Sequence, residues 1–232
     1  MKRMMIVPLG LLLLLASSAL ASPLCGSGAV GNGLDAYIAN YSGLSNACMI
    51  GDKLFYNFVY TPGGGTIIPS ASQIMLTSDT TDPIANPGLR ISSGVFSLFS
   101  GQTLDVTITY SVATASGSAL MEDYGLVLAG GNGGQPQFTG VGTVTESFLN
   151  GVGPLTASFG PGTANSAGAH VDFSPFIVGT TVNTHIVEIA GNNNLDISYI
   201  QENFSEVIPE PYAAVLIGSG LVLLGLRRKR GA

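Results

Sequence analysis

Tryptophan is absent from the chain of 232 residues, and the side chains that most often carry chemistry are scarce. There are two cysteines and two histidines, His170 and His185. Two histidines without an H-E-x-x-H helix or a cysteine cluster give no transition-metal signature. The G-x-S-x-G turn that carries the nucleophile of many hydrolases is also missing. The sequence therefore predicts no catalytic residues, no cofactor and no metal ligands.

Basic residues are also scarce between the two ends of the chain. Of eight Lys and Arg, two lie at the N-terminus and four at the C-terminus, which leaves Lys53 and Arg90 in between. All 14 Asp and Glu lie between these ends, so two cations against 14 anions give the middle of the chain a formal net charge of −12. A field of that sign argues against nucleic acid and acidic polymers as partners. It is compatible with Ca²⁺ or neutral glycans.

The N-terminus has the three parts of a secretory signal peptide. Lys2-Arg3 precedes an apolar stretch from Met4 to Leu15, and Ala19-Leu20-Ala21 supplies a small-x-small cleavage site. We expect cleavage between Ala21 and Ser22, so that residues 1–21 are removed and the rest is exported.

Cys25 and Cys48 form an even pair in a chain with an export signal, which predicts a disulfide. Lipid attachment at Cys25 is the rival interpretation. It is disfavoured because Ser22-Pro23-Leu24 separates Cys25 from the small residues that a lipobox would place directly before it.

The exported segment, residues 22–206, reads as one β domain. The clearest strand is Leu104–Tyr110, where apolar residues alternate with Asp105, Thr107 and Thr109; a period of two indicates one buried and one wet face. The other expected elements are strands at 54–60, 74–77, 124–129, 142–148, 171–178, 182–190 and 195–201, a short helix at 34–38 and a loop at 79–88. Gly191–Asn194 suggests a hairpin loop between the last two strands. Many short strands predict an antiparallel β-sandwich or jelly roll.

A few polar and aromatic residues of this domain are candidates for binding. Four tyrosines could offer a carbohydrate-binding face: Tyr56, Tyr60, Tyr110 and Tyr124. Asp79, Asp82 and Asn86 share a loop whose oxygens would suit Ca²⁺, although an ordinary turn is the simpler interpretation. His185 shares a strand face with Val187 and Ile189, which predicts a partly buried or sheet-edge histidine. Glu122 and Asp123 should point to opposite faces, unlike the carboxyl pair of a glycosidase.

The last 26 residues, 207–232, contain three pieces in order. Pro209-Glu210-Pro211 should be stiff and extended because proline restricts its own φ and the preceding residue. The apolar run 212–226 could form a transmembrane helix of about 22 Å, shorter than the ~30 Å hydrocarbon core. The basic tail, residues 227–230, should stop transfer and stay cytoplasmic; it consists of Arg227, Arg228, Lys229 and Arg230.

This order resembles the PEP-CTERM sorting signal. The resemblance implies processing near Pro209-Glu210-Pro211 by an exosortase-type membrane protease. It also implies a transient inner-membrane intermediate with a periplasmic domain, followed by delivery to the cell surface or the extracellular space. The resemblance further implies association with exopolysaccharide and biofilm. The expected function is that of a non-enzymatic surface or matrix protein. A carbohydrate- or calcium-binding module is the alternative, and a hydrolase is disfavoured by the missing catalytic residues.

Overall fold

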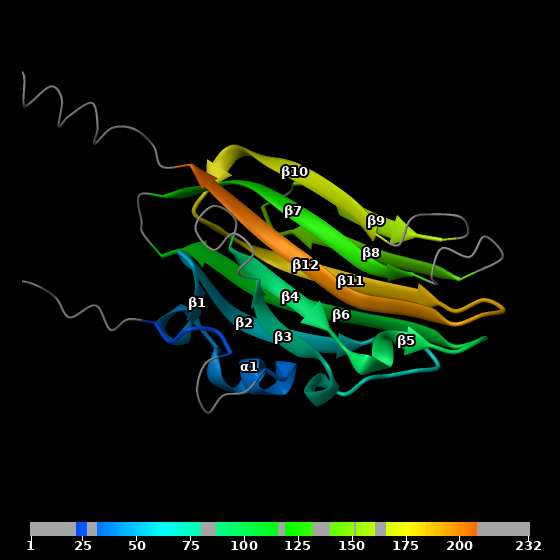
Figure 1. Ribbon diagram of the computed structural model, residues 1–232. Coiled ribbons are helices and arrows are strands. Elements are labelled where there is room, and N and C mark those ends of the chain that lie inside the picture. The colour runs from blue at the N-terminus through cyan, green and yellow to red at the C-terminus, as the bar shows by residue number, and fades with distance from the viewer. Residues whose placement is uncertain are drawn as a thin grey trace, which may run out of the picture.

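The computed structural model describes residues 22–26, 32–79, 87–115, 119–131, 140–150, 152–160 and 166–207. Within these ranges two antiparallel sheets pack face to face, which confirms the predicted β-sandwich (Figure 1). The expected signal peptide, Pro209-Glu210-Pro211, the apolar run 212–226 and the basic tail lie outside the described residues. Among the residues that are described, none of the helices has the length and apolar character needed to cross a bilayer.

Each sheet has its own set of strands. Sheet A has the spatial order β1 (Cys48–Ile50), β2 (Lys53–Pro62), β6 (Thr103–Thr114), β11 (Gly179–Ile189), β8 (Val141–Phe148) and β9 (Leu155–Phe159). Sheet B has the order β10 (Ser166–Ile177), β7 (Leu120–Gly131), β12 (Leu195–Val207), β4 (Gly88–Ser92) and β3 (Met75–Asp79), and β5 (Ser97–Leu98) pairs with β12. The helical elements are α1 (Leu34–Asn40) and the 3-10 turns Leu44–Asn46, Ala71–Gln73 and Gly94–Phe96.

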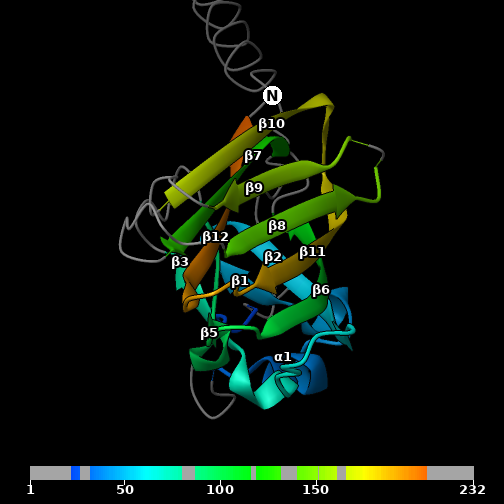
Figure 2. The same ribbon diagram turned by 90° about the vertical axis from the view of Figure 1, so that its right-hand side faces the viewer.

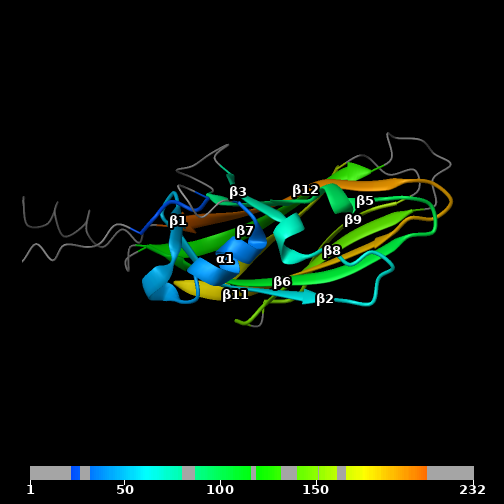
Figure 3. The same cartoon turned by 90° about the horizontal axis from the view of Figure 1, so that it is seen from below.

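Apolar alternation explains why these segments form sandwich strands. In β6, the residues Leu104, Val106, Ile108 and Tyr110 are fully buried between the sheets, whereas Asp105 and the threonines between them face outward. This is the pattern predicted from the sequence. Seen from below, the two sheets form separate layers (Figure 3). The buried apolar side chains of both sheets form one core cluster.

The predicted hairpin at Gly191–Asn194 is wrong. β11 pairs with β6 and β8 in sheet A, whereas β12 pairs with β7, β4 and β5 in sheet B. The loop therefore carries the chain from one sheet to the other. Glycine and asparagine allow a tight reversal, but they do not specify whether the next strand pairs with its predecessor or packs across the core from it.

The predicted loop 79–88 is shorter than expected. Asp79 is the last residue of β3, and Gly88 is the first residue of β4. An added Cβ at Gly88 would lie 1.8 Å from the backbone oxygen of Glu202, so only glycine allows β4 to approach β12 this closely. The sequence predicted a loop at Gly88 because glycine has no side chain to contribute to the alternating pattern of a strand.

The N-terminal part of the domain covers one edge of the sandwich. The helix predicted at 34–38 is present as α1, and Tyr37 on it packs edge-to-face on Phe58 at 5.0 Å between ring centroids. The predicted Cys25–Cys48 disulfide is present and buried. It closes a sequence separation of 23 residues, which stabilises the fold by about 3 kcal/mol in the chain-entropy account. Figure 2 shows α1 at one edge, opposite the edge strands β9 and β10.

The described chain begins and ends at the same end of the sandwich (Figure 1). Near its start, the amide of Met49 donates to the carbonyl oxygen of Pro23 at 2.8 Å, which attaches the N-terminal segment to β1. Near its end, Glu206 of β12 contacts Lys53, which follows the β1–β2 turn. β12 continues through Val207, which pairs with Leu120. The strand therefore ends six residues after its predicted end at 201 and one residue after the predicted domain boundary at 206.

Candidate functional site

The outer face of sheet A carries a continuous surface of short polar side chains. One row crosses five strands in register and consists of Thr61, Thr107, His185, Thr145 and Thr156. In the neighbouring row, Thr109 donates to Asn183 Oδ1 at 2.8 Å, and Asn183 Nδ2 contacts the Ser147 hydroxyl at 3.5 Å. We call these two rows the sheet A polar face. Neither Lys53 nor Arg90 lies on this face, since the Lys53 side chain is buried and Arg90 belongs to sheet B.

His185 is not a core or edge residue, which corrects the prediction. Its side chain is 46% exposed and lies on β11, between β6 and β8 in the middle of sheet A. Its Nε2 is 2.8 Å from Asp105 Oδ1. Val187 and Ile189 share its face as predicted, but that face is the outer one, because Thr184, Ile186 and Glu188 point inward. A strand with polar residues on both faces gave the wrong inside–outside assignment.

The four candidate tyrosines do not form one face. Tyr110 and Tyr124 are fully buried between the sheets. Tyr60 is half-buried against the core, and its hydroxyl donates to the carbonyl oxygen of Pro69 at 2.5 Å. Only Tyr56 lies on the outer side of sheet A, opposite Ser111. An aromatic stacking platform built from these four residues is therefore excluded.

Two glutamates that were not predicted as site residues lie side by side in the core. Glu146 of β8 and Glu202 of β12 are both fully buried. Tyr110 donates to Glu202 Oε2, and the Thr184 hydroxyl donates to Glu202 Oε1 at 2.8 Å. Burial raises the pKa of both carboxyls, and the adjacent Glu202 raises the pKa of Glu146 further. Because this cluster has no contact with solvent, we assign it to the core and not to a substrate site.

A third buried glutamate, Glu188 of β11, stands apart from this pair. It is fully buried, and neither carboxyl oxygen has a hydrogen-bond partner. Burial raises its pKa to about 9, with a smaller contribution from Asp196. The sequence could have revealed the buried position of Glu188, because this glutamate lies at the same period of two as the inward-facing Ile186 and Ala190.

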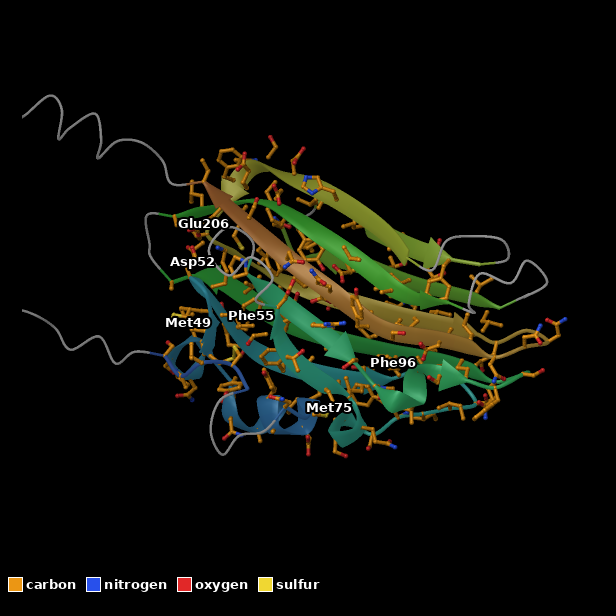
Figure 4. All side chains as sticks on the ribbon, viewed as in Figure 1. Met49, Asp52, Phe55, Met75, Phe96 and Glu206 are labelled. Carbon is orange, nitrogen blue, oxygen red and sulfur yellow. A yellow bond between two sulfur atoms is a disulfide. The ribbon has the colours of Figure 1, made fainter. Side chains whose placement is uncertain are left out.

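The one buried cation among the described residues, Lys53, forms an ion pair between β2 and β12. Lys53 Nζ lies 2.6 Å from Asp52 Oδ1 and 2.8 Å from Glu206 Oε2. The Lys53 side chain is fully buried, whereas those of Asp52 and Glu206 are 34% and 12% exposed. Figure 4 shows Asp52 and Glu206 together at the end of the sandwich where the described chain begins and ends.

The outer face of sheet B brings together three possible metal ligands. Asp123 of β7 lies opposite Asp172 of β10, and His170 precedes Asp172 by two residues on the same strand. One ligand atom from each of the three residues lies within 4.8 Å of the others. From the sequence, Asp123 was paired with Glu122 and His170 was assigned no metal site, so this grouping was not predicted. Of the predicted Ca²⁺ candidates, Asp79 accepts from Asn203 Nδ2 at 2.7 Å, while Asp82 and Asn86 lie outside the described residues.

Two solved structures show a remote likeness to the chain. No family model and no curated protein matches the chain. TmCBM61 in complex with β-1,4-galactotriose is similar at 6% identity and a TM-score of 0.31, over 66% of this chain and 88% of that one. The enzymatically active domain of bacteriophage CBA120 tailspike protein 4 is similar at 10% identity and a TM-score of 0.28, over 74% of this chain and 21% of that one. At these TM-scores neither likeness bears on function.

Proposed function

We propose that the chain is an exported, non-enzymatic protein of the cell surface or extracellular matrix, sorted by an exosortase-type membrane protease. The signal peptide delivers it, and residues 212–226 hold it transiently in the inner membrane with its β domain in the periplasm. Cleavage near Pro209-Glu210-Pro211 then releases or re-anchors the domain. The observation that carries the proposal is that both ends of the described domain leave the same end of the sandwich. Both membrane-directed segments thus attach to one end, and the buried disulfide suits an oxidising compartment.

Intact-mass measurement of the chain from surface and medium fractions tests the sorting. We expect a mass that begins at Ser22, lacks two hydrogens for the disulfide and ends before the basic tail. The double substitution P209A/P211A should leave the C-terminus intact and the chain in the inner membrane, because the stiff extended motif is lost. Pro154, exposed in the connection between β8 and β9, supplies the matched control P154A, which should be processed normally. An intact C-terminus on the wild-type chain in cells with an active exosortase contradicts the proposal.

The sheet A polar face supports contact with the surrounding exopolysaccharide as the role of the released domain. Its hydroxyl and amide groups are spaced regularly by the pairing of the strands. Such groups can exchange hydrogen bonds with sugar hydroxyls in the way that they exchange them with water. With no Lys or Arg on the face and an acidic domain around it, a neutral or weakly charged polysaccharide is the expected partner.

Removing hydroxyls from the sheet A polar face should weaken polysaccharide binding. The substitutions T107V and T145V keep β-branched side chains of similar shape in the strands, and they flank His185. At about 1 kcal/mol for each lost hydrogen bond, and tenfold in affinity for about 1.4 kcal/mol, the double variant should bind the cell's own soluble exopolysaccharide about 30-fold more weakly in a sedimentation assay. The matched control is T77V on β3 of sheet B. Equal binding by T107V/T145V and T77V would remove this face from the proposal.

A further inference from the structure

We propose that Asp123, His170 and Asp172 bind a divalent transition-metal ion, with Zn²⁺ the preferred ion. The site does not depend on the sorting or on the sheet A polar face. His170 Nε2 lies 2.9 Å from Asp172 Oδ1, and Asp123 lies directly across the β7–β10 ladder from Asp172. Two paired strands therefore hold all three ligands, and the backbone positions are fixed before any ion arrives.

Neither lysine nor arginine compensates the carboxylate charge at this site. Like charges directly opposite each other on neighbouring strands destabilise a sheet, and Asp123 faces Asp172 in this way. The stretch from 22 to 207 contains only two Lys and Arg. Lys53 is engaged by Asp52 and Glu206, and Arg90 lies 3.6 Å above the centre of the Tyr199 ring. No lysine or arginine is left for this pair, and the one basic side chain beside it is His170, which contacts Asp172. A cation from solution would supply the missing charge.

A second, independent feature points to a ligand at the same place. Ser205 of β12 pairs with Asp123 from the other side, which extends the row Asp172–Asp123 onto a third strand. The Ser205 hydroxyl oxygen is shielded from solvent and has no hydrogen-bond partner. A shielded hydroxyl without a partner is costly. Ser205 as a whole is only half-buried, so rotation of its side chain would let the hydroxyl bond to a water bound to a metal ion at Asp123.

Glycine leaves room for that water. Gly125 of β7 lies opposite His170 of β10 on one side and opposite Asn203 of β12 on the other. An added Cβ at Gly125 would meet no atom within 4 Å. The floor of the site beside His170 is therefore open, with the Asn203 side chain on its far side. The geometry thus offers three protein ligands and space for one or more water molecules.

The ligand set favours zinc over calcium. Zinc accepts imidazole nitrogen and carboxylate oxygen at about 2.0–2.2 Å, and sites with three protein ligands keep one position for water. Calcium takes six to eight oxygen ligands, whereas this cluster supplies one nitrogen and two carboxylates. His170 and Asp172 are 57% and 79% exposed, so their side chains can change rotamer to reach an ion without altering the core.

Calorimetric titration of the full-length chain with ZnCl₂ tests the assignment. We expect one site that H170Q and D123N each weaken at least tenfold, as loss of a direct ligand should exceed the 10- to 100-fold effect typical of outer-shell partners. The matched control is H185Q, because His185 also contacts one aspartate, Asp105, but is not grouped with a second carboxylate. Its zinc affinity should equal that of the wild type. Cobalt(II) should give a visible absorption band that H170Q abolishes and H185Q retains.

Three results would overturn the metal site. They are zinc affinity that H170Q leaves unchanged, equal losses in H170Q and H185Q, and a site that binds Ca²⁺ but not Zn²⁺ or Co²⁺. Circular dichroism of each variant in the presence of a chelator confirms the fold, and these exposed substitutions are expected to leave it intact. The intact-mass and exopolysaccharide assays use different residues, so failure of the metal site is distinguishable from failure of the proposed function.

Discussion

Replacing Lys53 with methionine should lower the free energy of unfolding by about 3–5 kcal/mol, the range for removal of one partner from a buried ion pair. Methionine fills a similar volume, so the effect comes from charge. Glu206, 12% exposed, and Asp52 would lose their common cation at the contact between β2 and β12. Urea unfolding of the full-length chain, followed by circular dichroism, measures the change.

The control for this prediction is R90M, which removes the other cation of the domain. Arg90 lies over the Tyr199 ring, and stacking of this kind contributes about 0.5–1 kcal/mol at an exposed site. R90M should therefore have a much smaller effect than K53M. A second variant, K53M/E206Q, should recover part of the loss, because it removes one of the uncompensated carboxylates. Equal stability of K53M and the wild type would show that the Lys53 contacts do not stabilise the fold.

Glu188 should make the protein less stable as the pH rises. The folded-state pKa of about 9 exceeds the ordinary value of 4.5, so between these pH values the folded chain binds more protons than the unfolded chain. Stability from this group is complete below pH 4.5 and is lost as the pH increases toward 9. At about 1.4 kcal/mol for each pH unit, the loss between pH 5 and pH 7 is about 3 kcal/mol.

The variant E188Q isolates this contribution because glutamine stays neutral at every pH. Relative to wild type, E188Q should gain about 3 kcal/mol between pH 5 and pH 7 in urea unfolding experiments. Glu122, half-buried on β7, supplies the matched control E122Q, which tests whether the gain is specific to position 188. Parallel curves for E188Q and wild type would show that Glu188 does not cause the loss.

The alternation of side chains made most of the sandwich predictable. Each expected strand overlaps an observed one, because it carries enough apolar residues at a period of two; the observed strands are β2, β3, β6, β7, β8, β10, β11 and β12. Several of them are longer than predicted. β1, β4, β5 and β9 were not predicted. They are short, from two to five residues, and a pattern of that length does not distinguish a strand from a loop.

Sheet membership could not be read from local sequence. The alternation in β11 and β12 is compatible with a hairpin or with two strands facing each other across the core, and only long-range packing decides between them. The same limit applies to the Asp123–His170–Asp172 group, whose members lie far apart in the chain and meet through the β7–β10 pairing. By contrast, the buried acids were accessible to prediction, since Glu146 lies between Val144 and Phe148 on an alternating strand.

The end of β12 has a consequence for the kinetics of sorting. Val207 is still hydrogen-bonded into sheet B through its pairing with Leu120, and Pro209 follows only two residues later. Fully extended, two residues span at most about 7 Å, so under the proposed sorting a protease must reach its substrate almost in contact with the folded surface. Cleavage would then require the last residues of β12 to separate from β7, beginning with the Val207–Leu120 pair. The rate of C-terminal cleavage would then depend on how often the end of β12 separates from β7.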